Sequence, residues 1–175
     1  ELTDWRPSAS IMEPGETRSG HYQFSTLCGD KLMCGFNRHI NGNCDTRTNI
    51  YYIESKDWGT TWTTVDGYPV TLPVSRWHDV SLVRDFQSEH RNCYIKDINF
   101  GTDGYPVILY LTSDNYLTGP NGGIRQWQTA HWNGREWIFN DLTTSTHCYD
   151  SGSIWIDDKN VWTVIAPTAV GPQYW

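Results

Sequence analysis

The chain has 175 residues, which predicts a single domain, and 14% of them are aromatic, including ten Trp and ten Tyr. This composition is typical of β-sheets and sugar-binding surfaces rather than of helical bundles. The formal net charge of −7 argues against a nucleic-acid partner, and no segment is apolar enough to span a membrane or to form a signal peptide. Because the chain begins at Glu1 and its segment 161–175 resembles an interrupted β unit, we expect a partial or processed chain.

Short strands separated by turn residues run along the chain, with no long segment of helical periodicity. A first cycle of four strands is predicted at 21–28, 31–38, 49–55 and 60–65, with a hairpin turn at Gly29-Asp30. After an irregular stretch, a second cycle is predicted at 93–100, 106–113, 124–132 and 136–142. A third cycle begins at His147, with strands predicted at 153–156 and 161–166.

The two complete cycles have the size of propeller blades, roughly 40–50 residues each. The predicted fold class is therefore all-β: a partial β-propeller of four-stranded antiparallel blades within one domain, 1–175. Its parts are a blade at 19–66, an irregular connection at 67–92, a blade at 93–143 and a partial blade at 147–175. Propellers close with about four to eight blades, so the ring would be completed by further sequence. A β-sandwich is the alternative.

One motif favours the propeller. The segment 55–62 has the form S-x-D-x-G-x-T-W and resembles the Asp box of bacterial neuraminidase repeats at Ser55, Asp57, Gly59, Thr61 and Trp62. The aspartate can accept backbone N–H groups in the turn, the glycine supplies an unusual backbone dihedral, and the tryptophan can cover the blade core. We expect this turn to join the third and fourth strands of the first blade and to stabilise the fold without taking part in chemistry.

In a four-stranded meander, the starts of strands one and three and the end of strand two share one rim, opposite the predicted Asp box. Chemically versatile residues fall at this rim in all three cycles. They are His21, His39, Arg125, Tyr116 and His147, with Tyr110 somewhat deeper. Propellers commonly build a central site from such segments.

This set of residues suits β-elimination at a uronic acid. Arg125 could pair with the substrate carboxylate and make the neighbouring C–H more acidic. A neutral His or an ionised Tyr would remove that proton, and a second His or Tyr would protonate the leaving glycosidic oxygen. The reaction needs no metal and no cofactor.

Several stretches, taken in their order and spacing, resemble the BNR-4 group of propeller proteins, which includes ulvan lyases and rhamnose–glucuronate lyases. They are Gly20-His21-Tyr22-Gln23-Phe24, Gly35-Phe36-Asn37-Arg38-His39, Lys96-Asp97-Ile98-Asn99-Phe100, Pro106-Val107-Ile108-Leu109-Tyr110-Leu111, His131-Trp132-Asn133-Gly134 and His147-Cys148-Tyr149-Asp150-Ser151-Gly152-Ser153. The resemblance covers most of the chain from residue 20 onward. It implies a secreted or periplasmic polysaccharide lyase acting on uronate-containing glycans.

In such lyases a His pair from the first blade, a Tyr and an Arg form the site. The resemblance therefore implies catalytic roles for His21, His39, Tyr110 and Arg125, with Tyr116 as a rival to Tyr110. It also leads us to expect that Tyr116, His147 and Arg38 bind substrate.

Each of these residues has a plainer interpretation. The two histidines could bond loop carbonyls, Arg125 could be a solvated edge residue, and Tyr110 could pack between sheets because it alternates with leucines. A sialidase is a rival function, but its characteristic FRIP-type segment is missing, and only Arg38, Arg91 and Arg125 could form its arginine cluster. A second rival is a non-catalytic glycan-binding propeller.

The five cysteines are an odd number, so at least one thiol stays unpaired within the chain. A zinc site formed by Cys44 or Cys148 with a nearby His is an alternative, but buried thiols are the expected outcome. His147 and Asp150 could hold a divalent ion, although two ligands make a weak metal site.

Overall fold

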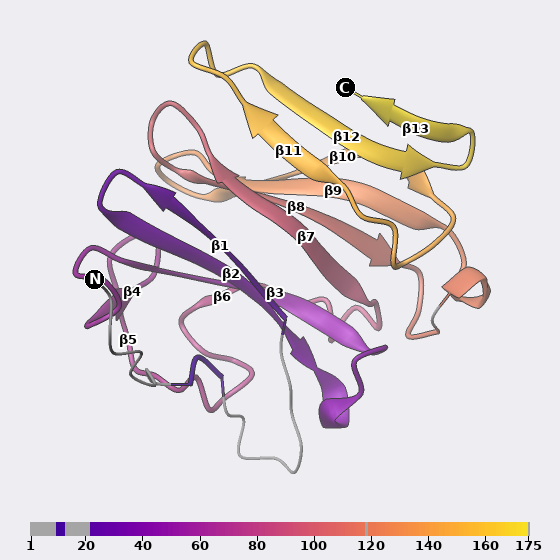
Figure 1. Ribbon diagram of the computed structural model, residues 1–175. Helices are drawn as coiled ribbons and strands as arrows, with labels where there is room; N and C mark the ends of the chain where they lie inside the picture. Colours follow the sequence, from indigo (N-terminus) through magenta and orange to yellow (C-terminus); the bar gives the residue numbers. More distant parts are fainter. Residues whose placement is uncertain (1–9, 13–21, 118, 175) are drawn as a thin grey trace, which may run out of the picture.

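The computed structural model describes residues 10–12, 22–117 and 119–174, which form three antiparallel sheets and no α-helix. The three sheets pack against one another in the order in which they occur along the chain, as Figure 1 shows. The predicted all-β fold with antiparallel blades is confirmed, and the arrangement is that of a partial propeller. None of the described helical segments is long and apolar enough to cross a membrane.

The first sheet holds the strands from the first predicted cycle and two more. Its strands are β1 (Gln23–Cys28), β2 (Lys31–His39), β3 (Arg47–Ser55), β4 (Trp62–Thr63), β5 (Pro69–Val70) and β6 (Leu82–Arg84). The order is β1-β2-β3-β4-β5, and β6 pairs with β3. A short 3₁₀ turn, η1 (Ile40–Gly42), follows β2.

The fourth position of this sheet differs from the prediction. A strand was expected at 60–65, but only Trp62 and Thr63 are extended, because a turn closes directly after them: the N–H of Gly67 donates to the carbonyl of Thr64 at 3.0 Å. The connection predicted as irregular instead supplies β5 and β6, and β6 pairs with β3 through Ile50 and Tyr51. The short strands β4 and β6 thus both pair with β3, along the edge that one longer strand was expected to fill.

The second sheet matches its prediction closely. Its order is β10-β9-β8-β7, with β7 (Cys93–Phe100), β8 (Pro106–Ser113), β9 (Arg125–Trp132) and β10 (Trp137–Ser145). The 3₁₀ turn η2 (Gly119–Gly122) lies between β8 and β9. The third sheet consists of β11 (Ser153–Ile156), β12 (Trp162–Thr168) and β13 (Gly171–Tyr174).

Apolar side chains fill the two spaces between the sheets. The core between the first and second sheets is formed by Met33, Ile50, Tyr52, Phe86, Cys93, Ile95, Ile98, Ile108, Tyr110 and Ala130. The core between the second and third sheets is formed by Tyr94, Val107, Leu109, Leu111, Trp127, Cys148, Ile154, Val164 and Ala166. Strands β7 and β8 contribute alternate residues to both cores, so the second sheet is buried on both faces.

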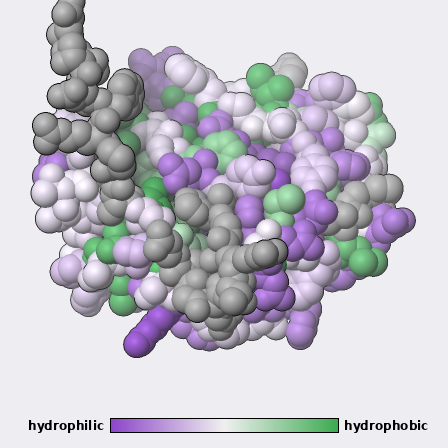
Figure 2. Space-filling view, turned by 60° about the horizontal axis from the view of Figure 1, so that its bottom comes forward, coloured by the Kyte–Doolittle hydropathy of each residue, from purple (hydrophilic) through white to green (hydrophobic). Residues whose placement is uncertain are grey.

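A third cluster covers the far side of the first sheet, with Phe36, Tyr51 and Ile53 at its centre. The bottom face of the molecule, outside the grey atoms, mixes hydrophilic and hydrophobic residues, as Figure 2 shows.

The five cysteines form no disulfide; three are buried as expected from the sequence, whereas Cys28 is half-buried and Cys44 is exposed. Cys34, Cys93 and Cys148 are buried, and burial raises the pKa of the Cys34 thiol to about 11. Within the described ranges, no three His, Cys, Asp or Glu side chains lie close enough together to hold a metal ion.

The segment with the Asp-box pattern forms the turn between β3 and β4. Ser55 Oγ accepts the N–H of Gly59 at 2.8 Å and donates to Asp57 Oδ1 at 2.8 Å. Asp57 in turn accepts the N–H and the hydroxyl of Thr61 at 2.8 and 2.7 Å, and these bonds lower the pKa of its carboxyl. Gly59 has a φ of +85°, and its carbonyl accepts the indole N–H of Trp62 at 3.1 Å.

Replacing Ser55 by Ala should destabilise the fold. The Ser55 side chain is buried, and its loss leaves the Gly59 N–H without its acceptor, so we expect the free energy of unfolding to fall by about 1–2 kcal/mol. Denaturant unfolding would measure the change. Ser151→Ala, at an exposed serine, serves as the control and should stay within about 0.5 kcal/mol of wild type. Equal stability of both variants would contradict the role given to this turn.

Candidate functional site

The two ends of the blades form two distinct rims. At one rim β2 ends and β3 begins, with His39 paired to Arg47, and β9 begins with Arg125 paired to Ser113. We call this the His39 rim. At the opposite rim, here the Ser55 rim, lie the 55–62 turn and the hairpin turns that follow β1, β7 and β9. The hairpin tips are at the upper left of Figure 1, and the coiled ribbons of η1 and η2 are toward the lower right.

Arg47 is the centre of the His39 rim. Its guanidinium carbon lies 3.9 Å from the ring centre of Tyr22, 5.4 Å from that of Tyr94 and 5.6 Å from that of Tyr149. These tyrosines come from the start of the first blade, from β7, and from the loop before β11, so all three sheets contribute to one aromatic cage. Cation–π contacts of this kind hold a positive charge in place without neutralising it.

Arg47 has no ion pair with any carboxylate in the described part of the chain. Its Nε donates to the carbonyl of Cys44 at 2.9 Å. The nearby acid Asp45 accepts the hydroxyl of Tyr149, and its backbone carbonyl accepts the hydroxyl of Tyr94 at 2.9 Å. Among the described residues, the Cys44 carbonyl is thus the hydrogen-bond acceptor of the Arg47 guanidinium.

Lys96 adds a second positive charge beside this cage. Its ammonium donates to the carbonyl of Cys148 at 2.8 Å and lies 5.7 Å from the ring centre of Tyr94. Burial, and then repulsion by Arg47, lowers the pKa of Lys96 to about 8. Two like charges held close together raise the local positive potential, which favours binding of an anion.

His39 occupies the position that the sequence predicted, at the rim opposite Asp57. It is the last residue of β2 and is only 5% exposed. Its ring centre lies 5.0 Å from that of Tyr22, so His39 and Arg47 both contact the same tyrosine. His21 lies outside the described residues, so its predicted proximity to His39 stays a prediction.

Arg125 lies at the same rim but is turned into the protein. The residue is 0% exposed, and its guanidinium donates to the carbonyls of Gly123 at 2.6 Å and Leu117 at 3.2 Å. A Cβ added at Gly122 would overlap an Arg125 nitrogen, so the loop closes tightly over this side chain. These contacts hold the loop between β8 and β9 in place.

Tyr110 is on the other face of the second sheet. It pairs with Gln128, whereas Arg125 pairs with Ser113, three residues further along β8, so the two side chains point to opposite faces. Tyr110 is fully buried, its ring lies 5.8 Å from that of Phe86, and its hydroxyl has no hydrogen-bond partner among the described residues. Burial raises its pKa. The structure therefore does not bring Tyr110 and Arg125 together.

Arg38 and Tyr116 meet at a different place, around Gln87. Arg38 donates to the Gln87 side chain at 2.8 Å and lies 5.3 Å from the ring centre of Trp77, while the Tyr116 hydroxyl donates to the Gln87 carbonyl at 2.7 Å. His147 lies at the edge of the Arg47 cage, with its ring 5.5 Å from that of Tyr149. Of the three residues expected to bind substrate, only His147 contacts the cage.

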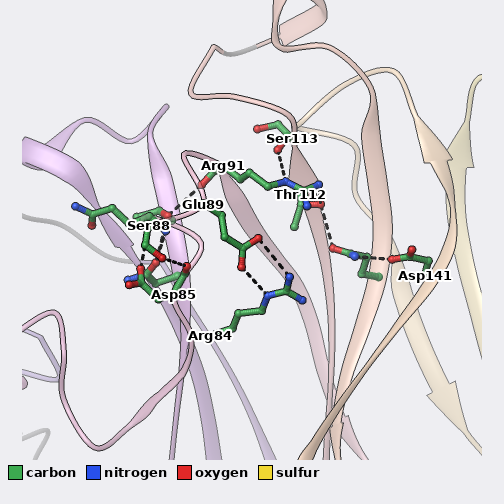
Figure 3. Close-up of polar contacts among 12 residues, drawn as sticks. Arg84, Asp85, Ser88, Glu89, Arg91, Thr112, Ser113 and Asp141 are labelled. Atoms are coloured by element: carbon green, nitrogen blue, oxygen red, sulfur yellow. Dashed lines mark hydrogen bonds and ion pairs between the residues drawn. The ribbon is translucent and has the colours of Figure 1, made fainter.

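A polar network fixes the segment before β7 against the second sheet, as Figure 3 shows. Arg84 pairs with Glu89 at 3.0 Å, and Arg91 donates to the Ser113 carbonyl at 2.9 Å and to the Thr112 hydroxyl at 2.8 Å. Thr112 continues the network through Gln128 to Asp141. The hydrogen bonds of Arg91 thus belong to this network. Arg38, Arg91 and Arg125 each bond a different part of the chain and do not form a cluster.

Arg47 and Lys96 were not among the site residues predicted from the sequence. The third strand was expected to begin at Asn49, which placed Arg47 in a loop, whereas β3 begins at Arg47 itself. Lys96 sits at a break in the regular pairing of β7 with β8, where Ile95 pairs with Tyr110 and Asp97 with Leu109. A cation just before a predicted inner strand, and one within such a strand, are the signals that could have identified them.

Comparison with known proteins gives a family and a fold. No curated protein matches the sequence. The similar solved structures include one described as a new family of polysaccharide lyase, PL25 ulvan lyase, and the same lyase bound to -[GlcA(1-4)Rha3S]-. Each has a TM-score of 0.56 and 13% identity, over 90% of this chain and 51% of the other.

The chain thus spans about half the length of these lyases, and at this identity the likeness establishes a shared fold. A model of the BNR repeat-containing family, BNR_4, matches residues 7–145, which is most of the sequence. The chain therefore belongs to the BNR repeat-containing family.

Proposed function

We propose that the chain forms part of a carbohydrate-active propeller that binds a uronic-acid-containing glycan at the His39 rim and cleaves it by β-elimination. The observation that carries this proposal is the juxtaposition of His39 and Arg47 on paired strands, both in contact with the half-exposed ring of Tyr22. A proton-transfer group, a cation and an aromatic surface are the parts that the reaction needs.

The reaction assigns one task to each part. The Arg47 guanidinium pairs with the uronate carboxylate and stabilises the negative charge that develops when the neighbouring C–H bond breaks. His39 takes the proton from that carbon. The electron pair of the C–H bond forms a carbon–carbon double bond, the glycosidic C–O bond breaks, and the leaving oxygen is protonated by Tyr22 or by His21.

This assignment differs from the one drawn from the sequence. There, Arg125 was expected to bind the carboxylate and Tyr110 to transfer a proton. In the proposal both have structural roles, because Arg125 is bonded to loop carbonyls and Tyr110 is enclosed in the core between the first and second sheets.

Two further features complete the proposal. The similar ulvan lyase that holds a glucuronate-containing saccharide supports a polysaccharide ligand in general. Polysaccharides of this kind occur outside cells, so we expect a secreted or periplasmic protein. Every proton transfer is assigned to a side chain, and we expect no cofactor.

A non-catalytic glycan-binding propeller is the second candidate. Tyr22 is 46% exposed and Tyr149 is 44% exposed, so both rings beside Arg47 could stack on sugars without any bond being cleaved. A sialidase is less well supported, because the three arginines available for its cluster do not converge.

The first test is direct. Elimination creates a conjugated double bond that absorbs ultraviolet light, whereas hydrolysis creates only new reducing ends. Incubating the protein with ulvan, gum arabic and similar uronate glycans should increase both absorbance and reducing ends. His39→Ala should lower the rate by about 10²–10⁴-fold, whereas His90→Ala, at an exposed histidine, should leave it unchanged. Reducing ends without absorbance would indicate a hydrolase, and binding without either product would favour the non-catalytic candidate.

The second test separates Arg47 from Arg125. Arg47→Ala should lower kcat/KM by about tenfold or more through loss of a charge-assisted interaction, while the fold is retained. Arg125→Ala should instead lower the free energy of unfolding by about 2–3 kcal/mol, because two loop carbonyls lose their donor. Kinetics and denaturant unfolding of both variants give the answer. If Arg125→Ala is stable and inactive while Arg47→Ala is active, the assignment drawn from the sequence holds and ours is wrong.

The third test uses pH. Lys96 is charged below its pKa of about 8 and neutral above it, so its attraction for an anionic glycan is present at neutral pH and is lost as the pH rises. We expect the affinity of the His39→Ala variant for a uronate oligosaccharide to fall several-fold between about pH 7 and about pH 9. Titration calorimetry would measure it. In the His39→Ala variant, the second substitution Lys96→Met should flatten this dependence of the affinity on pH. If the affinity of the double variant changes with pH as strongly as that of His39→Ala alone, Lys96 does not contribute.

A further inference from the structure

A cavity lies at the Ser55 rim, between the first and second sheets. Its volume is about 600 Å³, and its walls include Glu54, Thr63, Asp66, Tyr105 and Trp132. Small-molecule sites commonly enclose about 300–1,000 Å³. Strand β3, nine residues long, runs from Arg47 at one rim to Ser55 at the other, so the cavity is roughly 26 Å from the His39 rim.

Aromatic side chains line this cavity and two neighbouring ones. Trp132 also lines a cavity of about 170 Å³ beside Tyr52 and Trp137, and another of about 170 Å³ beside Trp162. The ring of Trp132 lies 5.9 Å from that of Trp137, which in turn lies 5.5 Å from that of Tyr52. The indole is thus held by ring contacts and lines three neighbouring hollows, whose other lining residues come from all three sheets.

The opposite wall offers hydrogen-bond acceptors in fixed positions. Glu54 is 5% exposed, and its carboxylate accepts the hydroxyl of Tyr52 at 2.8 Å and lies 3.4 Å from the Lys31 ammonium. The carboxylate is therefore pre-oriented where it borders the cavity. Asp66 adds a second, exposed carboxylate, and the Thr63 hydroxyl has no hydrogen-bond partner among the described residues.

The charge of this cavity differs from that of the His39 rim. Its walls carry the carboxylates of Glu54 and Asp66 and the cation Lys56, and Lys31 lies against Glu54, so positive and negative charges balance. The His39 rim instead holds the cations Arg47 and Lys96. A cavity with balanced charges offers no net attraction for a polyanion, while sugar hydroxyls can donate to carboxylates and sugar C–H faces can pack on aromatic rings.

We propose that the groove at the Ser55 rim is a second binding site, and that it takes a neutral saccharide. Rings, oriented carboxylates and hydroxyls are combined there in a cavity of suitable size. This site is independent of the elimination proposed for the His39 rim and would operate even if that reaction did not occur.

The experiment is titration calorimetry of the whole chain against neutral hexasaccharides of glucose, xylose, mannose and galactose, with a uronate oligosaccharide for comparison. We expect at least one neutral hexasaccharide to bind with a Kd of about 1 mM or below. Tyr105→Ala should weaken it by about tenfold or more, and Trp132→Phe should weaken it less. Glu54→Gln should also weaken it, because a charged acceptor is lost.

Two controls locate the binding. Trp155→Ala removes a tryptophan that is 67% exposed on β11, outside the groove, and should leave the affinity unchanged. Arg47→Ala should also leave it unchanged, since it alters only the His39 rim. Thermal melting of each variant separates lost binding from lost folding.

Three outcomes would overturn the proposal. They are the absence of binding by every neutral hexasaccharide at about 10 mM, binding that survives Tyr105→Ala and Glu54→Gln in folded protein, and binding abolished by Arg47→Ala. Preference of the groove for the uronate oligosaccharide would equally contradict it. None of these results depends on whether the chain cleaves a glycan.

Discussion

The burial of the second sheet on both faces is the constraint on which the other parts of the molecule depend. Strand β7 alternates between two cores, with Tyr94 facing the third sheet and Ile95 facing the first. Polar contacts then fix the sheets in register: the N–H of Ile95 donates to the Asn37 side chain at 3.0 Å, and Asn99 donates to the Ile154 carbonyl at 3.0 Å. Because apolar packing is non-directional, these hydrogen bonds decide how the blades align along their length.

Local breaks in strand pairing place the charged residues of the His39 rim. The pairing of β2 with β3 shifts at Asn37, and the pairing of β7 with β8 shifts at Lys96. Such bulges redirect side chains and are common beside functional sites. The shift at Asn37 precedes Arg38 and His39 at the end of β2. At this shift, Lys96 donates to the Cys148 carbonyl in the loop before β11, and Asp97 accepts the N–H of Ile154 in β11.

The strands could be predicted from the sequence because alternation and turn residues are local signals. Register is not local, and this explains where the prediction of the site diverged. Tyr110 and Arg125 were expected to share a rim, but whether they share a face depends on which residue pairs with which, and Arg125 pairs with Ser113. The third strand was expected to begin at Asn49, which left Arg47 outside it, whereas β3 begins at Arg47. Asn49 does have a turn-like φ of +63°, but within a continuous strand.

The loop before β3 also has a practical property. Cys44 is the exposed cysteine of the chain, since the other four are buried or half-buried, and its backbone carbonyl accepts the Nε of Arg47. A thiol-specific fluorophore can therefore be attached one backbone contact away from the caged cation, without removing any group of the cage. The sequence thus contains its own attachment point for a spectroscopic probe at the His39 rim.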